Sequence, residues 1–183
     1  MYLYGHGDSF RPAMDKKKVI RKVCLLGDGG VGKTSLVGRY VLDCFRDEYI
    51  MSFGTKVSKK VIEYEDVQLT LMIWDVLGQR SQKSLHAAYY NGANGAMLVC
   101  DQTREETLLH LPQWKEDLEK VTGPVPIIPI VNKSDLESEL ELKNVLETQA
   151  KLGRELLFTS AKTGNGVQDA FENLGRMLLE ARK

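Results

Sequence analysis

The chain has 183 residues, of which 43% are hydrophobic, and its 25 basic residues equal its 25 acidic residues in number. This length and composition suit one compact domain with a sizeable core, and the balanced charge argues against nucleic acid as a partner. No apolar stretch approaches the roughly 18 residues of a membrane-spanning helix, and the polar start has no signal-peptide core. Three cysteines without metal-ligand spacing favour a reducing compartment. We therefore expect a soluble, cytoplasmic protein.

Short apolar runs alternate with longer stretches of helical period, which is the pattern of a parallel sheet covered by helices on both faces. Residues 1–15 carry Gly, Ser and Pro without a period, so we expect a flexible extension there and a folded domain over residues 16–183. Strands are predicted at 18–26, 57–65, 67–75, 95–101, 126–131 and 154–159, and helices at 33–44, 82–91, 105–121, 136–151 and 166–181.

One short connection and one proline refine this pattern. Only Asp66 separates the predicted strands 57–65 and 67–75, which is too short for a parallel crossover. That pair must form a hairpin, so the sequence predicts an α/β fold whose sheet is mixed, with one antiparallel strand. Pro129 lies inside the predicted strand 126–131, where it would cost a ladder hydrogen bond if that strand is central.

The first motif that carries chemistry reads Gly-Asp-Gly-Gly-Val-Gly-Lys-Thr over residues 27–34, directly after an apolar run, and it matches a phosphate-binding P-loop. Glycines allow successive N–H groups to converge on phosphate oxygens, and the following helix adds its positive end. Lys33 is predicted to reach the β- and γ-phosphates, and Thr34 to ligate magnesium. The residues of this motif expected to bind the nucleotide are Gly29, Gly30, Val31, Gly32, Lys33, Thr34 and Ser35.

The second motif, Asp75-Val76-Leu77-Gly78-Gln79, ends the predicted strand 67–75. Asp75 is expected at the carboxyl end of that strand, where its carboxylate holds the magnesium shell through water or Thr34. The Gly78 N–H is expected to contact a γ-phosphate, and the Gln79 amide to orient an attacking water. We therefore predict Lys33, Gly78 and Gln79 as catalytic residues.

The third motif, Asn132-Lys133-Ser134-Asp135, follows an apolar strand and is expected to choose the base. A carboxylate at Asp135 matches the two adjacent donors of guanine with a bidentate pair that adenine cannot form. The stem of Lys133 is expected to cover the ring, and the N–H of Ala161 to reach the guanine oxygen. The residues predicted to bind the base are Asn132, Lys133, Asp135, Ser160, Ala161 and Lys162.

Together these motifs resemble those of the Ras superfamily of small GTPases, closest to its Rab and Ran-like branches, over roughly residues 18–181. The resemblance implies a P-loop NTPase fold in which about five helices flank a mixed sheet of about six strands. It implies Mg²⁺ as cofactor and GTP and GDP as ligands. It also implies GTP hydrolysis that toggles two switch segments, about 45–58 and about 76–91.

The resemblance also assigns residues in the first switch segment. Counting from the P-loop lysine places the family's magnesium-binding threonine at Ser52, because 52 − 33 = 19, with Thr55 as the alternative. A serine keeps the hydroxyl that the metal requires. Phe45 falls where the family stacks an aromatic ring on guanine, and Tyr49 where a tyrosine closes over the phosphates.

Departures from the family pattern affect the switches and the termini. Leu77 stands where a small residue usually lies near the γ-phosphate, which is expected to slow switch closure or hydrolysis. Arg80 replaces an acid associated with exchange-factor action; it serves partners or solvent, or acts as a built-in arginine finger. The sequence has no terminal cysteine and no Gly at position 2, so we expect no encoded membrane anchor, as in Ran-like or lipid-free prokaryotic relatives, unless a lipidated tail has been removed. The basic run Lys16-Lys17-Lys18 favours a solvated flank over a membrane patch.

The expected function is a slow GTP-hydrolysing switch whose partners are an effector, an exchange factor and a GTPase-activating protein. The chain is expected to be a monomer, with dimerisation through the switches as the alternative. A guanine-nucleotide-binding scaffold with negligible hydrolysis is the second possibility, if Leu77 and Arg80 block the closed switch. A small-molecule P-loop kinase would need an acceptor pocket and a lid, and it leaves residues 132–135 unexplained.

Overall fold

The computed structural model describes residues 16–43, 55–76 and 83–181, with the side chains of 83–86 left out. These residues form one sheet of six strands in the order β2-β3-β1-β4-β5-β6. The β2–β3 pairing is antiparallel, and the other four pairings are parallel. The structure therefore confirms the predicted α/β fold, a six-stranded mixed sheet with one antiparallel strand.

The strands are β1 (Lys17–Leu26), β2 (Lys56–Glu63), β3 (Val67–Asp75), β4 (Gly95–Asp101), β5 (Ile127–Asn132) and β6 (Leu157–Phe158). The helices are α1 (Lys33–Leu42), α2 (Lys83–Tyr90), α3 (Glu105–Leu109), α4 (Leu111–Thr122), α5 (Leu142–Leu152) and α6 (Val167–Glu180). Within the described part of the chain, no helix is both long enough and apolar enough to span a membrane.

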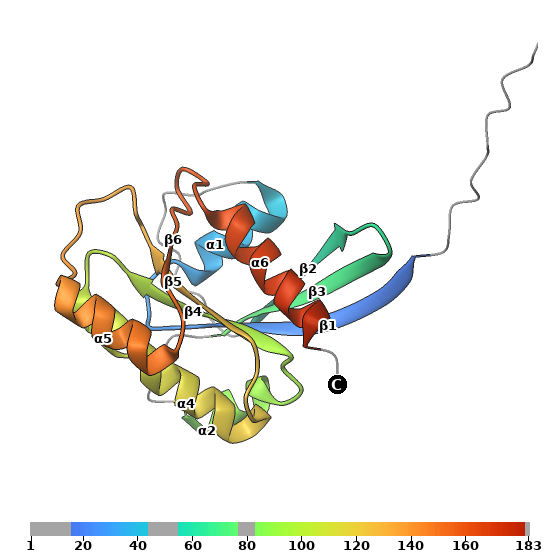
Figure 1. Ribbon diagram of the computed structural model, residues 1–183, viewed down its shortest axis with the longest axis horizontal. Helices are drawn as coiled ribbons and strands as arrows, with labels where there is room; N and C mark the ends of the chain where they lie inside the picture. Colours follow the sequence, from blue (N-terminus) through green and yellow to red (C-terminus); the bar gives the residue numbers. More distant parts are fainter. Residues whose placement is uncertain (1–15, 44–54, 77–82, 182–183) are drawn as a thin grey trace, which may run out of the picture.

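Helices cover both faces of the sheet, with α1 and α6 on one side and α2, α4 and α5 on the other (Figure 1). The hydrophobic core is correspondingly divided into two clusters. The α1 and α6 side holds Leu36, Leu69 and Phe171, whereas the opposite side holds Trp114 and Leu118. Every residue of β4 and β5 is buried because these strands lie under both helical layers. The carboxyl ends of the parallel strands are therefore held by core packing, and the loops that follow them share one edge of the sheet.

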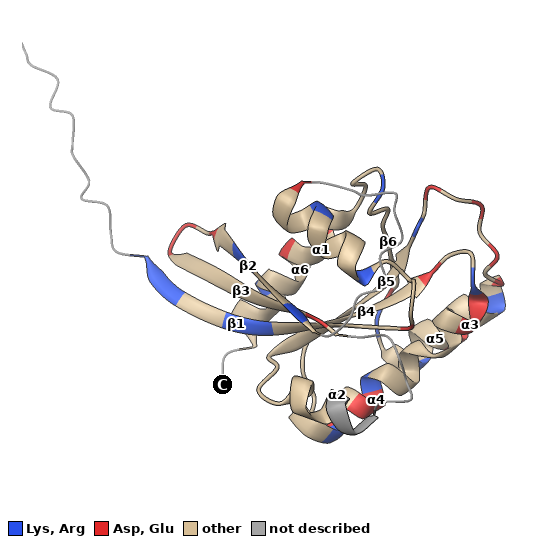
Figure 2. Ribbon diagram, turned by 180° about the vertical axis from the view of Figure 1, so that it is seen from behind, with Lys and Arg blue, Asp and Glu red and all other residues tan. Residues whose placement is uncertain are grey.

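Lysine and arginine gather on β1 and β2, at the end of the sheet away from β5 and β6 (Figure 2). Lys17 and Lys18 are exposed at the start of β1. Lys16 forms an ion pair with Glu63 of β2 at 3.2 Å, and both side chains are about half exposed. A surface ion pair of this kind adds little to stability. The contacts agree with the predicted solvated flank.

The segment 105–121, predicted as one helix, is two helices separated at His110. The N–H of His110 closes the end of α3 by donating to the carbonyl of Glu106 at 3.2 Å. Pro112 lies in the first turn of α4, a position that proline tolerates because the first N–H groups of a helix have no intrahelical partner. The proline therefore begins a new helix here.

Two further boundaries differ from the sequence prediction. Helix α5 begins at Leu142 rather than at residue 136. The preceding loop uses tertiary partners, because the N–H of Glu139 donates to the carbonyl of Gln102 at 3.0 Å. The last strand is limited to Leu157–Phe158 instead of 154–159. The late start of α5 follows from a contact with a distant segment that local periodicity does not report.

The register of β5 explains how Pro129 fits inside a buried strand. The carbonyl of Val131 accepts from the N–H of Thr159 on the β6 side at 2.8 Å. Alternate residues of a strand face the same neighbour, so Pro129 also faces β6. Pairing with β6 begins one residue later, where Ile130 lies opposite Leu157. The missing N–H of the proline therefore costs no ladder hydrogen bond, and the predicted penalty does not arise.

Candidate functional site

The phosphate loop, residues 27–32, joins β1 to α1 at the carboxyl edge of the sheet. At two of its glycines no side chain fits. A Cβ on Gly27 would lie 2.1 Å from the carbonyl oxygen of Val99, and a Cβ on Gly32 would lie 2.2 Å from Nδ2 of Asn132. Both glycines have positive φ angles, 143° and 98°, which other residues rarely adopt. The loop therefore packs against β4 and β5 only because these residues are glycine.

Lys33 begins α1, and its side chain folds back over the phosphate loop. The ammonium donates to the carbonyls of Gly27 at 2.7 Å and Asp28 at 2.8 Å. Burial lowers the pKa of Lys33 to about 8, the carboxylates of Asp75 and Asp28 offset part of this effect, and Arg104 adds to it. The site therefore holds a desolvated positive charge, which an anionic ligand would stabilise.

Thr34 and Asp75 meet beside this lysine. The Thr34 hydroxyl donates to the carboxylate of Asp75, the last residue of β3, which pairs in register with Leu25 of β1. Burial raises the pKa of Asp75, and the hydrogen bond from Thr34 and the charge of Lys33 offset only part of this increase. A hydroxyl and a carboxylate oxygen are the hard ligands that Mg²⁺ prefers, so this pair fits the predicted metal.

Asn132, at the end of β5, links the phosphate loop to the loop after β6. Its Nδ2 donates to the carbonyl of Val31 at 2.9 Å. Its Oδ1 accepts from the hydroxyl of Thr159 and the N–H of Ala161, each at 3.2 Å. Asn132 is buried, so these bonds are protected from water and rigid. The Ala161 N–H, predicted to reach guanine, thus donates to Asn132 in this structure.

The loops after β5 and β6 are also joined directly to each other. The Ser160 hydroxyl donates to Oδ1 of Asp135 at 2.6 Å, and the N–H of Ser134 donates to the carbonyl of Thr159 at 3.0 Å. Arg39 of α1 donates to the carbonyls of the following residues, Ala161 at 2.9 Å and Lys162 at 2.6 Å. These bonds fix the direction of the Asp135 carboxylate relative to the second loop.

Lys133 lies between them with a backbone that few side chains adopt. Its φ of 67° is in the left-handed region, which costs about 1–3 kcal/mol and concentrates at functional sites. The ammonium lies 2.5 Å from Oδ2 of Asp101. Burial acts to raise the pKa of Asp101, but hydrogen bonds from Lys133 and Thr103 outweigh it, and the net shift is downward.

Sequence reasoning missed Asp101, although a signal was present, since this carboxylate ends the apolar run 95–100 just as Asp75 ends its strand. It also missed Asp28, which contacts His110 and Trp114. No local pattern connects residues more than 80 positions apart. Trp114 itself is buried.

Several predicted site residues lie outside the described residues: Phe45, Tyr49, Ser52, Gly78 and Gln79, together with Leu77 and Arg80. Thr55, the alternative to Ser52, is described, and its buried hydroxyl has no hydrogen-bond partner among the described residues. Ser35 is half buried in the first turn of α1. The choice between Ser52 and Thr55 stays open.

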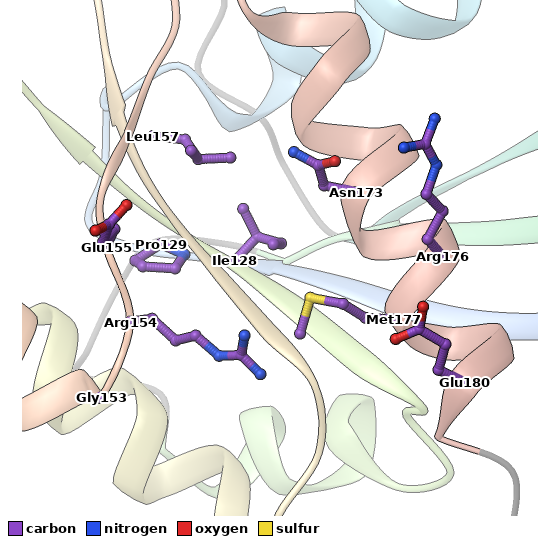
Figure 3. Close-up of a pocket in the computed structure, with 10 residues that line it drawn as sticks. All are labelled: Ile128, Pro129, Gly153, Arg154, Glu155, Leu157, Asn173, Arg176, Met177 and Glu180. Carbon is purple, nitrogen blue, oxygen red and sulfur yellow. The ribbon is translucent and has the colours of Figure 1, made fainter.

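A cavity of about 530 Å³ lies between α6 and the strands β5 and β6 (Figure 3). Its charged lining alternates in sign, with Arg154 and Glu155 on one wall and Arg176 and Glu180 on the other. None of the predicted site residues lines it. Within β5 it reaches Ile128 and Pro129, whereas the predicted site follows the far end of that strand. We assign it no part in the chemistry of the phosphate loop.

A glycine-rich loop, a Thr–Asp pair and two joined polar loops at the carboxyl edge of a parallel sheet define a P-loop nucleotide-binding protein. The sequence profile of the Ras family matches residues 22–180. The Ras-related protein RABA4b of Arabidopsis thaliana is 35% identical over 171 residues, which is 92% of this chain and 76% of that protein. The Ras-related protein Rab-13 of Mesocricetus auratus is 37% identical over 164 residues, which is 86% of this chain and 79% of that protein. The chain therefore belongs to the Ras family of small GTPases and is similar to its Rab members.

Proposed function

We propose that this chain binds GTP and GDP with Mg²⁺ and hydrolyses GTP slowly as a molecular switch. The proposed GTPase domain is residues 16–183, and the extension predicted at 1–15 lies outside the described residues. The observation that supports this most directly is Asn132, whose side chain at the end of β5 connects the phosphate loop to the loop after β6. A ligand with a polyphosphate at one end and a base at the other fits such a linked pair of sites.

The proposed phosphate contacts come from the backbone and from Lys33. Within the described residues, the N–H groups of residues 29–32 donate to no backbone carbonyl, so they are available to phosphate oxygens. Lys33 would exchange its contacts with the Gly27 and Asp28 carbonyls for the β- and γ-phosphates, which also relieves its desolvation. Gly29, Gly30, Val31, Gly32, Thr34 and Ser35 complete this part of the site.

The proposed metal ligands are Thr34 and Ser52, with Asp75 acting directly or through water. Mg²⁺ bound there would neutralise charge on the β- and γ-phosphates. The contact of Thr34 with Asp75 supports this assignment, because it already aligns a hydroxyl oxygen beside a carboxylate. Asp75 keeps the hydroxyl of Thr34 oriented at the phosphate end of the site.

The proposed base site consists of Asn132, Lys133, Asp135, Ser160, Ala161 and Lys162, with Phe45 stacked on the ring and Tyr49 closing over the phosphates. Ser160 holds one carboxylate oxygen of Asp135 at 2.6 Å, which orients the carboxylate for the two donors of guanine. A base without those donors would leave the carboxylate unpaired, and such sites reject the wrong ligand by roughly 10⁴-fold.

The proposed hydrolysis uses Gln79 to orient water and Gly78 to contact the γ-phosphate. Positioning without a partner's arginine gives slow turnover, on the order of 10⁻⁴ to 10⁻² per second, and an activating protein would raise it about 10³–10⁵-fold. We propose that segments 45–58 and 76–91 recruit effectors in the GTP state, that an exchange factor reloads the protein in the cytoplasm, and that the chain is a monomer.

Single-turnover hydrolysis of preloaded GTP tests the switch, with wild type compared to Gln79→Leu. Gln113→Leu on α4 is the matched control, since among the described residues the Gln113 side chain donates to Glu116 and Asp117 of the same helix. We expect wild type and control to hydrolyse GTP at one slow rate, and Gln79→Leu to be at least tenfold slower. Equal, negligible rates in all three would contradict the switch and support the scaffold alternative, for which the departures at Leu77 and Arg80 provide a reason.

A further inference from the structure

Asp28, the second residue of the phosphate loop, has both carboxylate oxygens engaged by one distant segment. Oδ2 lies 2.5 Å from Nδ1 of His110, which separates α3 from α4. Oδ1 accepts from the indole N–H of Trp114 at 2.9 Å, one turn into α4. The Asp28 side chain is mostly buried and that of His110 is about one-third exposed. A carboxylate with both oxygens held in this way has a fixed orientation.

Arg104 holds the next residue of the loop from the same side. Its guanidinium donates to the carbonyl of Gly29 at 2.8 Å and to Oδ2 of Asp101 at 3.1 Å. Asp101 in turn carries the ion pair with Lys133. Two successive residues of the phosphate loop are therefore attached to the segment that runs from the end of β4 into α4.

These contacts bear on nucleotide binding because a glycine-rich loop loses much conformational freedom when it orders around a ligand. A donor bound to the carbonyl of Gly29 keeps that peptide from rotating. Fixing the Asp28 carboxylate on His110 and Trp114 likewise prevents a negative group from turning toward the phosphates, where like charges repel. Both effects favour the loop conformation that receives phosphate oxygens.

We propose that His110, Trp114 and Arg104 are positioning residues for the polyphosphate, which hold the phosphate loop in its ligand-binding conformation from outside the nucleotide site. The proposal rests on the nucleotide binding proposed above. It assigns to the segment from the end of β4 into α4 a role that no motif in its sequence indicates. Arg104, just before α3, and His110, between α3 and α4, are both partly exposed. Changes at this part of the surface can therefore alter the rate of nucleotide release without contact with the nucleotide.

The test is the release rate of fluorescently labelled GDP from the full chain with magnesium present. His110→Phe and Trp114→Phe remove the two donors to Asp28 while keeping aromatic bulk, and Arg104→Gln removes the guanidinium at a partly exposed site. We expect about tenfold faster release for each, the order of a lost hydrogen bond to a charged group. His110→Asn keeps a donor at the position of Nδ1, so it should restore release to within about twofold of wild type.

Gln113→Leu, on the same helix, is the control and should release at the wild-type rate, because the Gln113 side chain donates to Glu116 and Asp117 and not to the loop. If His110→Asn releases as fast as His110→Phe, or if all three variants match the control, the positioning role is wrong. Arg104→Gln empties no core space, so the test survives if an aromatic variant fails to fold. A wild-type protein that binds no labelled GDP would instead overturn the proposed function, which separates the two failures.

Discussion

The phosphate loop and the two base loops are stabilised in opposite ways. The phosphate loop depends on distant residues, because Asn132 and Arg104 hold its carbonyls and His110 holds its carboxylate. The base loops depend mainly on each other, through the bond from Ser160 to Asp135 and the backbone bond from Ser134 to Thr159. The phosphate loop therefore offers backbone groups that residues outside the loop hold in place. The base loops offer side chains that hold one another in place. Changes in the phosphate loop should therefore affect every nucleotide, whereas changes in the base loops should affect only the choice of base.

The largest expected effect comes from Lys33→Met. The substitution keeps a long side chain but removes the buried ammonium, so we expect GDP and GTP affinity to fall about a thousandfold, as for two lost charge-assisted bonds. Isothermal titration with both nucleotides measures this. Lys120→Met, on the exposed surface of α4, should leave affinity unchanged. The same titrations are made with inosine nucleotides, which differ from guanine nucleotides in the base. If the loss of affinity differed between the two bases, the phosphate loop would not act independently of the base loops.

Gly27→Ala should cost about 3 kcal/mol of folding stability, because the added Cβ would collide with a backbone oxygen of β4 in a conformation closed to alanine. Gly29→Ala is the matched control for stability, since a Cβ there would meet nothing within 4 Å. Urea unfolding of both variants gives the free energies. Equal costs would contradict the close packing of the loop against β4.

The stability of the nucleotide-free protein should rise with pH between about 8 and 10.5. The pKa of Lys33 is lowered from 10.5 to about 8 by folding, so the unfolded chain binds the extra proton in that range and each step up in pH favours the native state. We expect a gain of about 3 kcal/mol relative to Lys33→Met, which lacks the group. Parallel urea titrations of the two proteins would show curves that converge as pH rises; curves that stay parallel would rule this out.

A smaller effect is expected from Ser160→Ala, which removes the hydroxyl that orients Asp135. Guanine nucleotide affinity should fall about tenfold, the value of one hydrogen bond to a charged group, while weak adenine nucleotide binding stays the same. Thr163→Ala in the same loop is the control, because within the described part of the chain the Thr163 hydroxyl accepts from the N–H of Asn165 at 3.3 Å and does not contact Asp135. Equal losses for both bases would show that Ser160 supports the loop rather than the choice of base.

Local chemistry in the sequence was sufficient for most of the fold. The single residue between two strand patterns required a hairpin, and the glycines at 27 and 32 marked a loop whose backbone adopts conformations that other residues rarely adopt. The break at His110 was missed although Pro112 signals it, since a proline inside a helical pattern ends that helix or begins a new one. The helical periodicity continues across the break and hid it. The start of α5 was missed because Glu139 bonds to Gln102 rather than within its own helix.

The position of a polar side chain at the sheet edge was predictable where that residue ends an apolar strand, as for Asp75 and Asn132. It was not predictable where the partner is remote. Nothing near Asp28 in the sequence indicates the donors at His110 and Trp114, which depend on how α4 packs against β4. The same holds for Arg104, whose contact with Gly29 requires the loops after β1 and β4 to lie at one edge of the sheet.

Whether the linked loops form a guanine site is tested by comparing GDP and ADP binding to wild type and Asp135→Asn at equal magnesium. If the linked loops form a guanine site, wild type should bind GDP at least a thousandfold more tightly than ADP, and the substitution should remove most of that preference by weakening GDP alone. Equal affinity of wild type for the two nucleotides, or an unchanged preference for GDP in Asp135→Asn, would show that Asp135 does not select guanine.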